Sequence, residues 1–172
     1  MYGWYNELIF IIGGIIMFRA VEDFSTEWQA SSKGTLDVFH ELTDETLQQA
    51  IVGGHNTLGS LAWHLTEVAM VFGNFAGLNM PTLEEGKKQP THVSEIIDTY
   101  EAVLEAYKKG IVSLTDDALV EEIEALGGIM PRGKLLYALI QHQTHHVGQM
   151  TVLLRQAGLR VPPVMGPTAE MQ

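Results

Sequence analysis

Two histidines, His142 and His146, lie four residues apart in the segment HQTHHVGQ. They follow Leu135 and Leu139 at the three-and-four spacing of an apolar helical face, where further core residues would be expected. Residues four apart on a helix have Cβ atoms roughly 5–6 Å from each other, so both imidazoles can converge on one point. Because a neutral imidazole is the commonest metal ligand, this pair predicts a metal site on the inward face of a helix.

A third histidine, His64, lies on the apolar stripe of a different predicted helix, together with Leu61 and Val68. Three imidazoles from two facing helices can occupy three positions around a divalent ion and leave another for water or substrate, as in catalytic zinc sites. A single buried histidine is more often a hydrogen-bonded core residue, but burying three of them unpaired would cost roughly 1–3 kcal/mol each. We therefore interpret His64, His142 and His146 as ligands of one divalent ion.

His145 competes with His146, because it lies three residues after His142. On a helical wheel it is rotated about 100° from His146, toward the edge of the apolar stripe, so we expect it at the rim of the site. Glu67 and Gln149 each lie about one turn from a predicted ligand. Either could orient the second nitrogen of a ligand or hold the metal's water, or could simply be exposed.

The remaining histidines, His40, His55 and His92, fall near predicted helix ends or in loops. We expect them to be solvated, although His55 could line the mouth of the site. Trp28 and Trp63 are interpreted as packing residues.

The composition is that of a globular protein of one domain, with 46% apolar and 18% charged residues in 172. A formal net charge of -11, without a basic stripe, argues against a nucleic-acid partner. Cysteine is absent, so any metal must be held by nitrogen or oxygen donors. This absence fits a reducing compartment, and we expect a cytoplasmic protein.

Residues 1–16 are predicted to be an apolar extension ahead of the domain. The apolar run from Leu8 to Phe18 is shorter than the roughly 20 residues that span a membrane. It also lacks the basic residues before it and the small-residue cleavage site after it that a signal peptide has. We therefore expect no membrane partner, a domain over residues 17–160, with Met17 as a possible natural start, and an extended tail over residues 161–172.

The periodicity predicts four long helices, from about Arg19 to Leu42, Leu58 to Phe75, Val93 to Leu114 and Lys134 to Ala157. A short helix is predicted from Asp44 to Ala50, and Gly158 should end the last long helix. Residues 76–92 and 115–133 form long connections, and we find no β-hairpin pattern. The predicted fold is all-α, a four-helix bundle with two long crossover connections, which is a fold that builds metal sites between facing helices.

Two segments carry a family resemblance: TLGSLAWHL at residues 57–65, and HQTHHVGQ followed by LLRQAG within residues 142–158. They resemble the DinB/YfiT-like metal-binding bundles, over roughly residues 17–158. The resemblance implies an up-down-down-up four-helix bundle that is often dimeric. It also implies a divalent ion, zinc or nickel in many members, bound by three histidines that correspond here to His64, His142 and His146.

Characterised members of this family include transferases that use low-molecular-weight thiols such as bacillithiol or glutathione, and a mycothiol-dependent isomerase. We therefore expect a metal-dependent thiol S-transferase that acts on small electrophiles, and a homodimer. One alternative is metal-assisted hydrolysis, with Glu67 or a loop carboxylate as general base. Another is a non-catalytic module in which the ion only stabilises the bundle.

Overall fold

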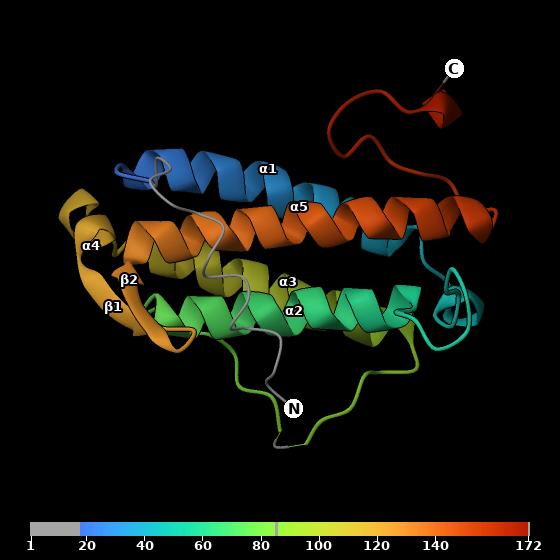
Figure 1. Cartoon of the computed structure of the whole chain (residues 1–172), viewed down its shortest axis with the longest axis horizontal. Helices are drawn as coiled ribbons and strands as arrows, with labels where there is room; N and C mark the ends of the chain where they lie inside the picture. Colours follow the sequence, from blue (N-terminus) through green and yellow to red (C-terminus); the bar gives the residue numbers. More distant parts are fainter. Residues whose placement is uncertain (1–17, 85, 172) are drawn as a thin grey trace.

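Four long helices form the body of the protein, which is a computed structural model that describes residues 18–84 and 86–171. They are α1 (Val21–His40), α2 (Leu58–Phe75), α3 (Val93–Ile111) and α5 (Arg132–Gln156). Helix α5 packs against α1 and α2, and α3 packs against the same two helices. Helices α1 and α5 run in one direction and α2 and α3 in the other (Figure 1). The predicted all-α bundle is confirmed, with the helix directions that the family resemblance implied.

The start of α2 and the end of α5 are each set by residues next to them in the chain. The Thr57 hydroxyl accepts a hydrogen bond from Ser60 N at 3.1 Å, and the Ser60 hydroxyl accepts one from Thr57 N at 2.8 Å. This capping box satisfies two backbone donors at the start of α2, which begins where it was predicted. Helix α5 is followed by Gly158 at φ +72°, and Leu159 N donates to Leu154 O at 2.9 Å. The predicted stop at Gly158 is therefore confirmed.

Other predicted boundaries were wrong. Helix α1 ends at His40 instead of Leu42, and α3 ends at Ile111 instead of Leu114. The predicted helix from Asp44 to Ala50 is only a 3-10 turn, Asp44–Thr46. A capping box of Thr43 and Thr46 opens this turn. The helix does not continue, because the carbonyls of Leu47 and Gln49 accept hydrogen bonds from Gly59 N and Leu58 N, both at 2.9 Å, at the start of α2.

The connection between α3 and α5 contains a β-hairpin, contrary to the prediction. Helix α4 (Asp116–Val120) precedes strands β1 (Glu122–Ala125) and β2 (Gly128–Pro131), which pair antiparallel. Leu126 at φ 54° and Gly127 at φ 80° provide the two positive φ angles of a tight hairpin turn. The hairpin packs on α5, and the whole connection stays at one end of the bundle (Figure 1). Of the two predicted crossovers, only the first, described over residues 76–84 and 86–92, runs along the bundle (Figure 1).

The predicted limits of the domain concern the first and last residues of the chain. The predicted extension over residues 1–16 lies outside the described residues. The Phe18 ring packs edge-on against Tyr137, with ring centroids 6.0 Å apart. The predicted tail turns back, because Val164 lies against Gly34 and Arg155 Nε donates to Glu170 Oε1 at 3.0 Å. No helix within residues 18–84 and 86–171 is long and apolar enough to cross a membrane.

A buried amide connects all four long helices. Gln143 of α5 is 0% exposed, and its Oε1 accepts hydrogen bonds from Thr35 Oγ1 of α1 at 3.0 Å and from Tyr100 OH of α3 at 3.2 Å. Its Nε2 donates to Leu65 O of α2 at 3.2 Å. Because buried polar groups must be paired, this network allows few alternative alignments of the helices.

Replacing Gln143 by methionine should lower the free energy of unfolding of the metal-free protein by about 1–3 kcal/mol, because the buried Tyr100 hydroxyl loses its acceptor. Urea unfolding followed by circular dichroism measures the change. Gln141→Met, an exposed position on the same helix, is the matched control and should shift the value by at most about 0.5 kcal/mol. Adding Tyr100→Phe to Gln143→Met should recover part of the loss; equal stability of Gln143→Met and Gln141→Met would contradict the role of the network.

Candidate metal centre

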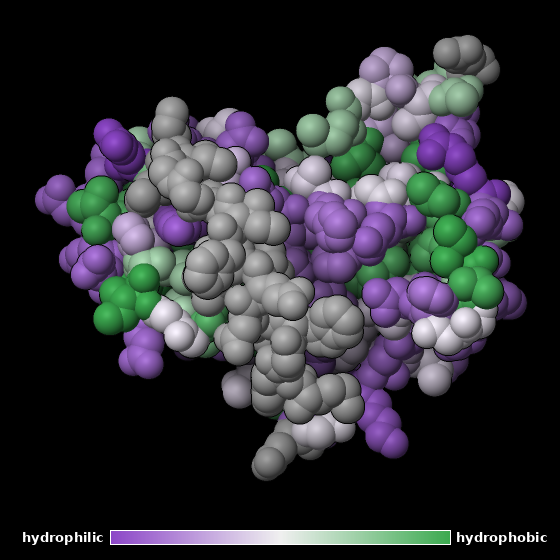
Figure 2. All heavy atoms as spheres, in the orientation of Figure 1, coloured by the Kyte–Doolittle hydropathy of each residue, from purple (hydrophilic) through white to green (hydrophobic). Residues whose placement is uncertain are grey.

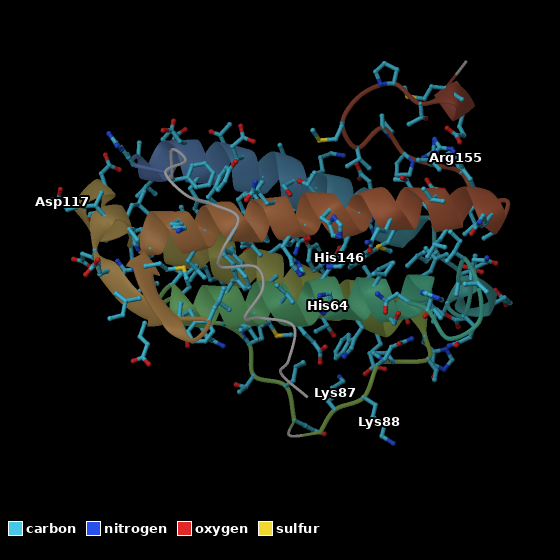
Figure 3. All side chains as sticks on the ribbon, viewed as in Figure 1. His64, Lys87, Lys88, Asp117, His146 and Arg155 are labelled. Carbon is cyan, nitrogen blue, oxygen red and sulfur yellow. The ribbon has the colours of Figure 1, made fainter. Side chains whose placement is uncertain are left out.

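The structure brings the three predicted histidines together between α2 and α5. His64 comes from α2 and His146 from α5 (Figure 3). His142 lies one turn before His146 on α5. One ring nitrogen from each lies within 4.8 Å of those of the other two. His64 Nε2 and His142 Nε2 are 3.2 Å apart. Within residues 18–84 and 86–171, this is the one group of three histidines or carboxylates with the spacing of metal ligands.

The level at which the histidines meet is set by the buried amide beside them. Gln143 directly follows His142, and the backbone carbonyl to which it donates belongs to Leu65, which directly follows His64. A slip of one turn between α2 and α5, about 5.4 Å, would break that hydrogen bond and separate the two imidazoles. The aromatic ring of Phe72 lies 6.3 Å from that of His142 and forms an apolar wall on the α2 side.

The three histidines lie at the edge of the apolar stripe and not at its centre, which corrects the sequence interpretation. Each is partly exposed. The buried stripe of α5 instead passes through these residues: Leu136, Leu139, Gln143, Val147, Met150 and Leu154. This second three-and-four series is visible in the sequence and could have identified Gln143 as a buried polar residue. A catalytic ligand set needs such an edge position, because a substrate must reach the ion from solvent.

Burial keeps the candidate ligands neutral. It is the main cause that lowers the pKa of His64 to about 4 and that of His142 to about 3, and the neighbouring imidazoles add to the effect. Burial also lowers the pKa of His146, although a hydrogen bond to Gln149 opposes this. At neutral pH all three rings therefore keep a lone pair for a cation.

The donor set fits a divalent ion. Two nitrogens at about 2.0–2.1 Å from a tetrahedral zinc ion are roughly 3.3–3.4 Å apart, close to the 3.2 Å between His64 Nε2 and His142 Nε2. The other nitrogen of His142, Nδ1, is buried and has no hydrogen-bond partner among the described residues. Nε2 is thus the nitrogen of His142 that faces the other rings. Neutral nitrogen donors suit zinc and nickel, among other divalent metals.

Gln149 and His145 lie beside the third candidate ligand, His146, on the exposed side of α5. His146 Nδ1 is 2.9 Å from Gln149 Oε1, and Gln149 Nε2 is 3.0 Å from His145 Nε2. His145 is exposed and does not belong to the group of three nitrogens. Figure 2 shows hydrophilic side chains gathered over the middle of α5 on this face.

Glu67 lies on the next turn of α2 after His64 and is partly buried. Burial raises the pKa of its carboxyl group, and the neighbouring Trp63 indole partly offsets the rise. Trp63 and Trp28 are both buried, as expected of packing residues. Lys87 Nζ lies 5.7 Å from the centre of the Trp63 ring and holds the crossover segment against α2.

The other histidines lie apart from the three-nitrogen group. His40 and His55 are exposed. His92 is also exposed, but its Nδ1 is 2.8 Å from Asp44 Oδ2, and Asp44 Oδ1 accepts a hydrogen bond from Val93 N at the start of α3. This contact ties the 3-10 turn to α3 and raises the pKa of His92 through the hydrogen bond to Asp44.

The metal-free protein should lose stability as the pH falls from about 6.5 to about 4. Histidines of the unfolded chain gain protons near pH 6.5, whereas His64 and His142 of the folded protein stay neutral until about pH 4 and 3. The unfolded state therefore binds more protons in this window, so acid favours unfolding. Urea unfolding in the presence of a chelator at several pH values measures the slope. His142→Gln should reduce it and His55→Gln, an exposed control, should not; identical slopes for all three proteins would contradict the assignment.

Comparisons with known proteins agree with this architecture. The sequence profile of the DinB family matches residues 17–172. The chain is 39% identical over 155 residues to the uncharacterized protein YrdA of Bacillus subtilis (strain 168). The matched region covers 90% of this chain and 93% of YrdA. A crystal structure of a DinB-like protein from Bacillus cereus ATCC 10987 is similar with a TM-score of 0.76 and 38% identity, over 85% of this chain and 98% of that one.

A second solved structure extends the likeness in fold. The DinB-like protein YjoA of Bacillus subtilis matches with a TM-score of 0.67 and 17% identity, over 84% of this chain and 99% of that chain. At this identity the match concerns the fold alone. Because the family profile spans all the described residues, the chain belongs to the DinB family.

Proposed function

We propose that this protein binds one divalent metal ion, zinc or nickel, through His64, His142 and His146, and that it is a thiol S-transferase acting on small electrophiles. The observation that carries the proposal is the convergence of three neutral imidazole nitrogens within 4.8 Å of one another. The family membership supports it, because the DinB/YfiT-like resemblance noted in the sequence implies an ion bound by three histidines that correspond to this trio.

The placement of the ligands suits an incoming substrate. His64, His142 and His146 are partly exposed, and they approach from two helices only. Three donors from two neighbouring helices cover one side of an ion and leave the solvent side open. When bound, a divalent ion supplies Lewis acidity that lowers the pKa of a thiol or of water at the open position. The thiol must come from outside, since the chain has no cysteine.

Metal-assisted hydrolysis is the second candidate, and Glu67 favours it. This carboxylate is partly buried one turn from His64, and burial raises its pKa. A carboxylate whose pKa is closer to neutrality is a better general base toward water. Turnover without any thiol is what separates this candidate from the first.

A homodimeric assembly and a cytoplasmic location stay predictions from the sequence and the resemblance.

Metal content tests the ligand assignment. Protein purified without a histidine tag and dialysed against zinc or nickel should retain about one ion per chain. His146→Ala should weaken binding by more than about 100-fold, because it removes a donor from the ion itself. His55→Ala, an exposed histidine outside the site, is the control and should bind like the wild type. Elemental analysis and titration calorimetry measure both quantities, and undiminished binding by His146→Ala would refute the assignment.

Activity of the metal-loaded protein tests the reaction. We expect conjugation of a low-molecular-weight thiol, bacillithiol or glutathione, to a small electrophile, followed as loss of free thiol. Chelation or His146→Ala should abolish the catalysed rate, and His55→Ala should preserve it. Ester and amide substrates without thiol form the parallel assay: turnover there that Glu67→Gln lowers by about 100-fold or more would favour hydrolysis instead. A loaded protein inactive in both assays would leave the ion a structural role.

A further inference from the structure

Three side chains form a hydrogen-bonded series on the exposed side of α5, and its last member is a proposed metal ligand. His145 Nε2 lies 3.0 Å from Gln149 Nε2, and Gln149 Oε1 lies 2.9 Å from His146 Nδ1. Gln149 is one turn beyond both histidines, so the helix itself brings its amide to both rings. We infer that Gln149 is a positioning residue that keeps His146 Nε2 free for the ion, and that His145 holds Gln149 in place; this rests on the proposed function.

The polarity of the amide decides where the protons lie. An amide oxygen only accepts hydrogen bonds and an amide nitrogen only donates them. With Oε1 toward His146, the proton of that neutral ring must be on Nδ1, so Nε2 keeps its lone pair. With Nε2 of Gln149 toward His145, the Nε2 of His145 must be the unprotonated acceptor. The reversed amide would place the proton of His146 on Nε2 and remove the third donor from the site.

His146 is the ligand that needs this support. Among the described residues, it alone of the three donates or accepts a side-chain hydrogen bond outside the group. His142 is held differently, by burial beside the Phe72 ring. His146 lies toward the exposed side of α5, next to His145. A ring with solvent on one side is free to rotate unless its second nitrogen is bound, as second nitrogens of metal-ligating histidines usually are.

Zinc affinity of Gln149 variants is the first test, measured by competition with a chromophoric chelator. Gln149→Leu removes the acceptor at similar size and should weaken zinc binding by about 10- to 100-fold. Gln149→Glu keeps an oxygen that accepts from His146 Nδ1 and should bind at least as tightly as the wild type. Gln156→Leu, an exposed glutamine two turns further on α5, is the matched control and should have no effect. His145→Ala should weaken binding by only about 2- to 5-fold, because it loosens Gln149 without removing it.

The tautomer of His146 is the second test, and a purely structural role of Gln149 would not change it. Nitrogen-15 NMR of the metal-free wild type should show His146 protonated at Nδ1. In Gln149→Leu the ring should become a mixture in which Nε2 carries the proton in a substantial fraction of molecules. Gln156→Leu should retain the wild-type spectrum.

The possible failures are distinguishable. Full zinc binding by His146→Ala would overturn the proposed metal site itself. Loss of zinc in His146→Ala, together with wild-type affinity and an unchanged tautomer in Gln149→Leu, would overturn only the positioning role. Weakened binding in Gln149→Leu that Gln149→Glu does not share, with a shifted tautomer, is the result that supports it.

Discussion

The buried amide of Gln143 fixes how the four long helices are aligned with one another. It receives hydrogen bonds from α1 and α3 and donates one to α2, so a single side chain of α5 connects all four long helices. Apolar packing alone would tolerate neighbouring alignments of these helices, since the hydrophobic effect has no direction. A buried amide does not tolerate them, because each shifted alignment of the helices would leave buried polar groups unpaired, at a cost of about 1–3 kcal/mol per group. This alignment also positions the candidate site. His142 precedes Gln143 on α5, and His64 precedes Leu65, whose carbonyl accepts from Gln143, on α2.

The position of the three histidines balances two opposing needs. Deeper burial would lower their pKa values further and keep them neutral in more acid conditions, but it would close the ion to a substrate. Greater exposure would let protons and water compete for the nitrogens. At the edge of the apolar stripe the rings are buried enough for the pKa of His64 to fall to about 4, yet each remains partly exposed. Gln143 occupies the centre of the buried stripe, where it aligns the helices and is not a candidate ligand.

Features governed by short spacings could be predicted from the sequence, and those governed by distant partners could not. The span of α2 followed from the spacing of its apolar residues and the end of α5 from Gly158, and both signals are local in the chain. The grouping of the histidines followed from helical spacing together with two facing helices. The role of Gln143 was missed, because its partners Thr35 and Tyr100 come from other helices. The β-hairpin was missed because its turn contains Leu126, and leucine rarely adopts the positive φ that a tight hairpin turn requires.

The chemistry of the donor set narrows what the proposed site is suited to do. Three neutral imidazoles leave the full charge of a divalent ion in place, whereas thiolate or carboxylate ligands would neutralise part of it. The ion would then polarise a molecule at its open position more strongly than one held by anionic ligands. The chain also has no cysteine of its own to occupy that position. A proposed site of this kind suits the activation of an external nucleophile, while the hydrogen bonds of Gln143 align the four long helices through other side chains.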